Sequence, residues 1–281
     1  MIPIMLRSFG RSGSTLMMQV LGSHKNVAFD RVYPFENRHL TYIHRLSAVM
    51  KKERKFSEQW GPDTLFNSNA LYVGATPYKN IEIFNENDLS RRSLEYLWKA
   101  LSEEILEKSE DFDLSLPTYY AEKVVQDICH DINSVVEAKN LFVFRDPRDE
   151  FISIKSFNEK RGFNGFGWLE SDTDESFALR MAESRKEYMR NLVNINNDHR
   201  RMVILYERFM ESPHEHTKKI GDWIGLELSY DTVLDGLGSV SQHITGGNVS
   251  EPRWKKELPL SIKQIFGNIL GEELLALGYE V

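Results

Sequence analysis

The chain has 281 residues, 41% of them hydrophobic, and its 42 Asp and Glu against 35 Lys and Arg give a formal net charge of −7 at pH 7. This size and composition predict one large α/β domain over residues 1–281, and the negative charge argues against general binding to nucleic acids or anionic membranes. The single cysteine, Cys129, excludes an internal disulfide and a cysteine-cluster metal site. No apolar run has membrane-spanning length and no signal-peptide pattern opens the chain, so we expect an intracellular, cytoplasmic protein.

The N-terminal stretch predicts a strand, a tight turn and a helix. The apolar run of residues 2–6 fits one buried strand, and apolar side chains recur at helical spacing over residues 16–23. Between them, Gly10 and Gly13 permit a tight turn with close approach of a ligand, and the helix start offers unpaired N–H groups. Arg11 adds a positive charge. Ser12, Ser14 and Thr15 add hydroxyl donors.

This pattern predicts an anion cradle, most simply for a phosphate group. It differs from the nucleotide-triphosphate loop G-x-x-x-x-G-K-[ST], because Gly10 and Gly13 are too close together and Ser14 stands where the lysine belongs. An ordinary glycine- and serine-rich turn is the alternative interpretation.

The next segment is rich in reactive side chains and is followed by several simple elements. Residues 27–38 combine aromatic, acidic and basic side chains, and we expect them to return to the same end of the sheet as the anion cradle. A helical or loop insertion is expected at about 37–70. The other elements expected here are a helix over 38–58, a loop over 59–70, a strand over 71–75, a helix over 90–108 capped by Asp88 or Ser90, a strand over 119–125 and a helix over 127–138.

A second informative stretch, R-D-P-R-D, follows the apolar strand expected over 140–144. Arg145 stands at the carboxyl end of that strand, Asp146 can cap the next helix, and the proline suits the first helical turn. In the helix expected over 147–157, Ser153 is placed to share an anion with Arg145. A capped helix with a surface arginine is the alternative.

The remaining residues continue the alternation of strands and helices, which predicts a doubly wound sheet. The expected elements are a loop over 159–168, a helix over 174–194, a strand over 202–206, a helix over 213–225, a polar loop over 239–256 and a terminal helix over 260–276. Glycines and aromatics alternate in the loop over 159–168. Such a loop suits either an acceptor-binding lid or packing on the protein's own body.

Three of these stretches resemble motifs of the sulfotransferases. R-S-G-S-T at 11–15 resembles their 5′-phosphosulfate loop, R-D-P-R-D with a serine eight residues after its first arginine resembles their 3′-phosphate motif, and the loop at 239–256 resembles their late closing loop. The chain thus resembles the bacterial and carbohydrate or tyrosyl-type enzymes that use 3′-phosphoadenosine 5′-phosphosulfate. The resemblance implies a P-loop-like three-layer fold, with a central parallel sheet flanked by helices.

The resemblance also implies roles for individual residues. The residues expected to bind the donor are Arg11, Ser12, Gly13, Ser14 and Thr15 at the 5′-phosphosulfate, Arg145 and Ser153 at the 3′-phosphate, and Arg253 and Lys255, with the backbone of Gly246 and Gly247, in the closing loop. The residues expected to act in catalysis are Arg11 at the leaving 5′-phosphate, Lys123 at the transferring group, and Glu36 as the base that takes the acceptor's proton.

The choice of base leaves alternatives. Glu36 is preferred and Asp30 is second, with His24 or His39 as the next candidates. The alternative is that Glu36 is a surface residue beside Arg38 and has no catalytic role.

Other site residues also have structural alternatives. For Lys123 the structural alternative is a surface pair with Glu122. For Trp254 it is packing against the terminal helix. Glu207 belongs to a Tyr-Glu pair that the family has at a strand end, and we expect it to be structural and to pair with basic groups.

The predicted function is therefore sulfuryl transfer to an acceptor hydroxyl, without a metal ion. The acceptor is expected to be a small molecule, a sugar or a peptide, and no nucleic-acid or membrane-spanning role is expected. The alternatives are a nucleoside or small-molecule kinase with a degenerate phosphate loop, and a non-catalytic nucleotide-binding module.

Overall fold

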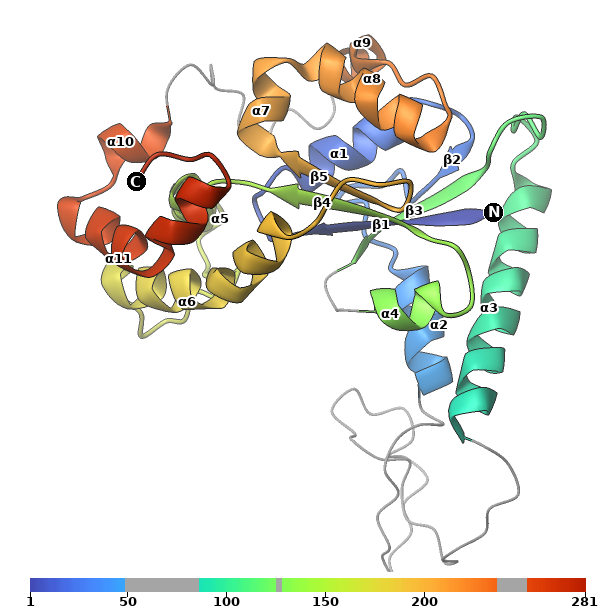
Figure 1. Cartoon of the computed structure of the whole chain (residues 1–281), viewed down its shortest axis with the longest axis horizontal. Coiled ribbons are helices and arrows are strands. Elements are labelled where there is room, and N and C mark those ends of the chain that lie inside the picture. The colour runs from blue at the N-terminus through green and yellow to red at the C-terminus, as the bar shows by residue number, and fades with distance from the viewer. Residues whose placement is uncertain (49–85, 125–127, 237–251) are drawn as a thin grey trace, which may run out of the picture.

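The computed structural model describes residues 1–48, 86–124, 128–236 and 252–281 (Figure 1). Its centre is a sheet of five parallel strands in the order β2-β3-β1-β4-β5. The strands are β1 (Ile2–Ser8), β2 (Val27–Ala28), β3 (Tyr119–Val124), β4 (Lys139–Phe144) and β5 (Arg201–Leu205). Helices flank the sheet on both faces, so the prediction of a three-layer α/β fold is confirmed.

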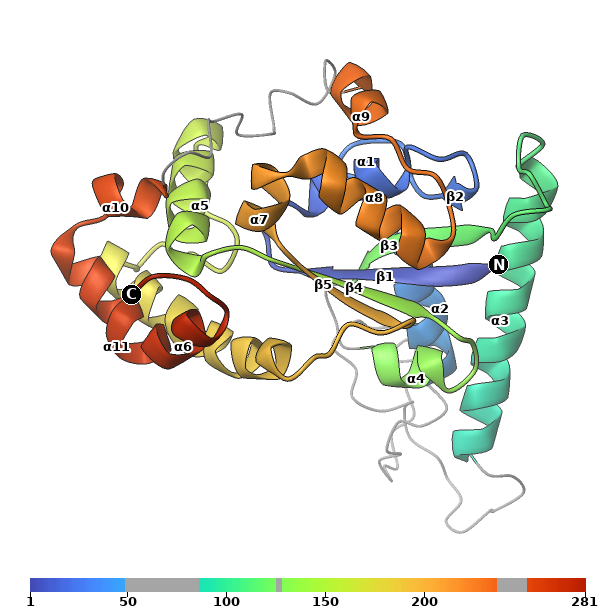
Figure 2. The same ribbon diagram turned by 45° about the horizontal axis from the view of Figure 1, so that its top comes forward.

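The helices form three groups around this sheet, as Figures 1 and 2 show. One face carries α1 (Ser14–Leu21), α7 (Tyr206–Glu211), α8 (Pro213–Ile224) and α9 (Tyr230–Gly236). The opposite face, near β1 and β3, carries α2 (His39–Ala48), α3 (Glu86–Lys108) and α4 (Cys129–Asn133). The third group lies around the end of β4 and consists of α5 (Pro147–Arg161), α6 (Asp174–Val193), α10 (Arg253–Glu257) and α11 (Leu260–Ala276).

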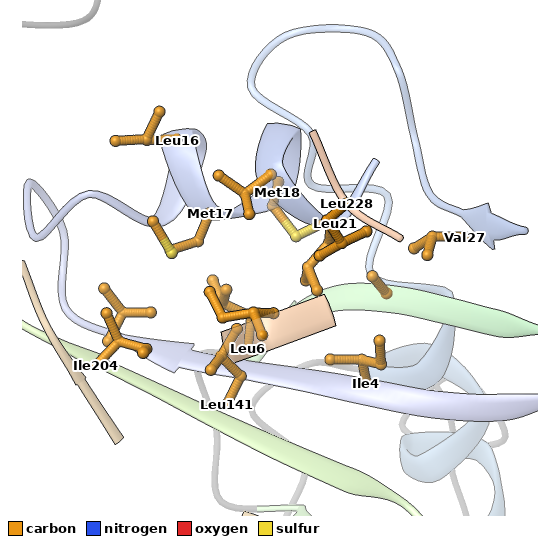
Figure 3. Close-up of a cluster of buried hydrophobic side chains, with 14 of the residues drawn as sticks. Ile4, Leu6, Leu16, Met17, Met18, Leu21, Val27, Leu141, Ile204 and Leu228 are labelled. Carbon is orange, nitrogen blue, oxygen red and sulfur yellow. The ribbon is translucent and has the colours of Figure 1, made fainter. Parts of the chain in front are cut away.

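The core follows from the alternation of side chains along each strand. Ile4 and Leu6 of β1 point toward α1 and pack with its apolar side (Figure 3). Met5, between them, points to the other face and packs with α2, α3 and α4. On β4, Phe142 and Phe144 pack with α5, α6 and α11. Both faces of the sheet are therefore buried, which explains why its strands read as nearly continuous apolar runs.

Several predicted boundaries were wrong. The last strand ends at Leu205 because Tyr206 already begins α7, and the helix expected over 127–138 spans only Cys129–Asn133. The helix expected over 90–108 begins at Glu86, so Asp88 and Ser90 lie inside it and cannot cap it.

Parts of other predictions lie outside the described residues. Of the insertion at about 37–70 and the helix over 38–58, the structure describes α2 and the residues just before it. The loop over 59–70 and the strand over 71–75 are not among the described residues, nor is most of the closing loop over 239–256. No described helix is long and apolar enough to span a bilayer.

Candidate active site

The anion cradle joins β1 to α1 at the carboxyl edge of the sheet. Arg11 has φ 66° and Gly13 has φ 91°, so the chain turns sharply before α1 begins at Ser14. The buried hydroxyl of Ser12 donates a hydrogen bond to the carbonyl oxygen of Phe9 and closes the turn. The first N–H groups of α1 have no intrahelical acceptor and face the turn, which is the arrangement that binds anions.

Gly13 is required by space as well as by conformation. Its φ lies in the left-handed region, and a Cβ there would lie 2.4 Å from Cδ2 of Tyr206. The Tyr206 ring also lies 4.9 Å from the guanidinium carbon of Arg145. The Tyr206 ring thus packs against both the cradle and Arg145, a contact that no sequence motif indicated.

The two predicted phosphate motifs meet at Arg11. Nε of Arg11 donates to Oγ of Ser153 at 3.2 Å, and Nη1 of Arg145 donates to the carbonyl oxygen of Arg11 at 3.2 Å. Arg145 is 8% exposed, forms no ion pair with the described carboxylates, and its buried Nε has no hydrogen-bond partner. Burial lowers the pKa of Arg11, and the nearby charges of Arg145 and Arg161 lower it further. The positive charges and the unpaired donor fit a polyanionic ligand.

Lys123, at the end of β3, connects the cradle to Glu36. Its Nζ donates to Oγ1 of Thr15 at 3.1 Å, to the carbonyl oxygen of Pro34 at 2.7 Å and to Oε1 of Glu36 at 3.4 Å. Burial lowers the pKa of Lys123, and the charge of Glu36 partly opposes that shift. Glu36 is also paired with Arg38 at 2.9 Å and is one-third exposed. The structure therefore gives Glu36 both the predicted surface pair and a place beside the cradle.

The alternative pairing of Glu122 with Lys123 was wrong. Neighbouring residues of a strand point to opposite faces, and Glu122 points toward α2. Its carboxylate accepts hydrogen bonds from the backbone N–H groups of Leu40 and Thr41 at the start of that helix. Glu122, which is distant from α2 in the sequence, therefore caps the N-terminus of that helix.

The other candidate bases lie in structural roles. Oδ1 of Asp30 accepts the backbone N–H of Val32 at 3.0 Å, and Nδ1 of His24 accepts that of Asn26 at 3.1 Å. His39 is exposed at the start of α2. Within the described structure, none of these three side chains is hydrogen-bonded to the cradle.

Arg253 and Lys255 are paired with carboxylates. Arg253 makes two hydrogen bonds of 2.7 Å to Glu257, and Nζ of Lys255 lies 2.6 Å from Oε2 of Glu280. Gly246 and Gly247 lie outside the described residues. Both predicted phosphate-binding side chains of the closing loop are thus held by carboxylates in this structure.

The rest of the R-D-P-R-D motif attaches the C-terminal segment to α5. Asp146 caps α5 as predicted, accepting the backbone N–H of Arg148. The Arg148 guanidinium pairs with Asp146 and lies 3.6 Å from the centre of a Trp254 ring. Oδ1 of Asp149 accepts the backbone N–H of Trp254 at 2.8 Å. Trp254 also packs with Phe266 and other apolar residues of α11, as its structural alternative predicted.

Glu207 is structural, but its predicted basic partners were wrong. Oε1 accepts the backbone N–H of Asp146 at 3.0 Å, and Oε2 accepts the hydroxyl of Tyr279 at 2.8 Å. Burial, with the neighbouring charge of Asp146, raises the pKa of Glu207 to about 7. The residue supports the backbone next to Arg145.

The loop over 159–168 packs on the protein's own body and also reaches the cradle. Trp168 stacks on Phe177 at 4.2 Å between ring centres and packs on the protein's body. Phe166 lies against the cradle, since a Cβ on Gly10 would come within 2.2 Å of its ring. The alternation of glycines and aromatics was the signal for this close approach, although it did not identify the residue.

A hollow of about 490 Å³ lies beside this loop but away from the cradle. Lys155, Asn158 and Glu159 line it, and at 3.6 residues per turn they are on the opposite side of α5 from Ser153 and Phe157. It is thus separate from the predicted phosphate sites. The described residues contain no group of three His, Cys, Asp or Glu placed to hold a metal ion.

This chain is similar to known proteins in both sequence pattern and fold. A family model described as sulfotransferase family matches residues 3–230. The sulfotransferase domain from the curacin biosynthetic pathway has a TM-score of 0.54 at 16% identity, over 99% of this chain and 98% of that chain. This likeness supports the fold.

Two further structures are similar at lower scores. A sulfotransferase from Alicyclobacillus acidocaldarius has a TM-score of 0.48 at 11% identity, over 100% of this chain and 97% of that chain. Mouse sulfotransferase SULT7A1, solved in complex with PAP, has a TM-score of 0.49 at 11% identity, over 97% of this chain and 84% of that chain. No curated protein sequence matches the chain.

Proposed function

The chain belongs to the sulfotransferase family, and from that premise we propose that it transfers a sulfuryl group from 3′-phosphoadenosine 5′-phosphosulfate to an acceptor hydroxyl by in-line displacement. One set of contacts carries the proposal. The ammonium group of Lys123 lies between Thr15 of the cradle and the carboxylate of Glu36. An anion site, a cation and a candidate base therefore lie together at one edge of the sheet.

The residues of the cradle fit a donor with two separated phosphate groups. We assign the 5′-phosphosulfate to Arg11 and to the backbone N–H groups of Gly13, Ser14 and Thr15. Ser12 would contribute through its backbone, because its hydroxyl is bonded to Phe9.

We assign the 3′-phosphate to Arg145 and Ser153. The buried Nε of Arg145, which has no partner, supports this assignment. Arg253 and Lys255 would join the 3′-phosphate only after release from Glu257 and Glu280.

Sulfuryl transfer, like phosphoryl transfer, depends mainly on positioning and on electrostatic stabilisation. The bound donor supplies the sulfuryl group: the bond from the acceptor oxygen to sulfur forms as the bond from sulfur to the 5′-phosphate oxygen breaks. Glu36 takes the acceptor's proton on its carboxylate. Lys123 places its charge beside the sulfuryl oxygens, and Arg11 stabilises the negative charge that develops on the leaving phosphate.

A panel of ligands in a thermal-shift assay tests the proposal against its alternatives. A ligand that binds only the native state stabilises it, by about 2.7 kcal/mol at 100 times its dissociation constant. Adenosine 3′,5′-bisphosphate should raise the melting temperature, whereas ATP with Mg²⁺ should not. Stabilisation by ATP with Mg²⁺ alone would favour the kinase alternative, and no response to the bisphosphate would contradict the proposal.

A further inference from the structure

A row of side chains on α5 leads from the phosphate site to a cation that the proposed reaction does not use. Ser153, Phe157 and Arg161 follow at intervals of four residues, which places them on the same side of the helix. Ser153 is bonded to Arg11, and the Phe157 ring centre lies 4.5 Å from the Arg11 guanidinium carbon. Arg161 continues the row about 12 Å along the axis from Ser153. It therefore lies beyond Arg11, at the end of α5 away from Arg145.

Three aromatic rings and two hydrogen bonds hold the Arg161 guanidinium. Its carbon lies 4.0 Å from the ring centre of Phe163, 5.1 Å from that of Phe166 and 5.2 Å from that of Phe157. Nε donates to the carbonyl oxygen of Phe163 at 3.0 Å, and Nη2 donates to Oδ1 of Asn158 at 2.7 Å.

The loop backbone is also shaped around this guanidinium. A Cβ on Gly165 would lie 1.7 Å from Nη2 of Arg161, so the absence of a side chain there makes room for the cation. This position is therefore built by the helix and the following loop together.

The charge of Arg161 is not neutralised within the part of the chain that the structure describes. Arg161 forms no ion pair with any carboxylate of the described residues, and it lies close enough to Arg11 to lower the pKa of that group. A cation in the last turn of a helix is favoured by the helix dipole, but that role requires neither the three rings nor the bond to the loop. Two cations packed against the Phe157 ring create a place where an anion is favoured.

We propose that Arg161 binds an anionic group, such as a carboxylate, on the acceptor, which would be a hydroxy acid with an apolar or aromatic body. This inference rests on the proposed function, in which the donor's anionic groups are already assigned to residues 11–15, Arg145 and Ser153. Phe163 and Phe166 are 62% and 41% exposed and provide apolar contact area beside the cation.

Matched acceptor pairs test this assignment. We would measure kcat/KM with the phosphosulfate donor for 4-hydroxyphenylacetate against 4-hydroxyphenylacetamide, and for 10-hydroxydecanoate against its amide. At least one acid should exceed its amide by about 10- to 100-fold, the range for one charge-assisted hydrogen bond. Arg161→Gln should bring that ratio close to one, and Arg161→Lys should keep part of it. Lys160→Gln removes a charge one position away, about 100° around the helix, and should leave the ratio as in the wild type.

Three results would overturn the assignment: equal or better use of the amides, no turnover of either acid, or a preference that survives in Arg161→Gln. Titration of each variant with adenosine 3′,5′-bisphosphate confirms that it is folded. It also tests the donor, because a loss of more than about tenfold in Arg161→Gln would place Arg161 in the donor site and refute the acceptor role. A wild type that binds the bisphosphate but has no acid preference refutes this inference alone, whereas a wild type that does not bind it refutes the proposed function.

Discussion

Replacement of Arg145 by alanine should cause a large loss of bisphosphate affinity. Nη1 donates one hydrogen bond within the protein, to the carbonyl oxygen of Arg11, while the buried Nε has no hydrogen-bond partner. A guanidinium can offer two parallel donors to a phosphate group. Two charge-assisted hydrogen bonds of about 1.5–3 kcal/mol each give a loss of about 3–6 kcal/mol. At 1.4 kcal/mol per tenfold change, this is about 10²- to 10⁴-fold in Kd.

Isothermal titration calorimetry with adenosine 3′,5′-bisphosphate measures this loss directly. Arg145→Lys should fall between wild type and alanine, because a point charge remains but the bidentate geometry does not. Arg200→Ala is the matched control, since it removes a half-exposed arginine paired with Glu137 just before the start of β5, at the opposite edge of the sheet. An Arg145→Ala variant with wild-type affinity and melting temperature would refute the assignment of the 3′-phosphate.

Three further predictions follow from the same geometry. Gly13→Val should abolish bisphosphate binding in the same titration, because its Cβ would meet Tyr206 and block the backbone; retained binding would make the cradle an ordinary turn. Glu36→Gln should lower kcat by about 10²- to 10⁴-fold while bisphosphate affinity stays within about twofold, and Asp30→Asn should matter less; the reverse order would make Asp30 the base. The pKa of Glu207 is about 7 in the folded state, against an ordinary value of 4.5, so the folded state keeps a proton that the unfolded chain releases. The protonated Glu207 therefore contributes fully to stability below about pH 4.5, and this contribution is lost as the pH rises through 7. Urea unfolding at pH 5 and pH 8 should show that Glu207→Gln removes about 2.5 kcal/mol of this pH dependence, and an unchanged difference between the two pH values would show that Glu207 is not its source.

The convergence of the two phosphate motifs could be predicted because it depends on topology. Arg11 follows β1 and Arg145 follows β4, and the carboxyl ends of adjacent parallel strands open on the same edge of a sheet. The same argument brings Lys123, at the end of β3, to that edge. Neighbouring side chains of a strand alternate between its two faces, so the expectation of a strand over 119–125 already argued against a pair between Glu122 and Lys123.

The side-chain partners could not be predicted, because they depend on packing between distant segments. The sequence around Arg253 and Lys255 does not indicate whether these side chains bind a phosphate group or pair with Glu257 and Glu280. Tyr206 was placed on a strand by its apolar neighbours, and its contact with Gly13 requires the positions of both α1 and α7.

The central claim is that this site recognises the 3′-phosphate of an adenosine bisphosphate, and one comparison tests it most directly. Wild-type protein is titrated with adenosine 3′,5′-bisphosphate and with adenosine 5′-phosphate, which differ only in that group. We expect the bisphosphate to bind at least about 100-fold more tightly, as two charge-assisted hydrogen bonds from Arg145 require. Equal affinity for the two nucleotides would contradict the account.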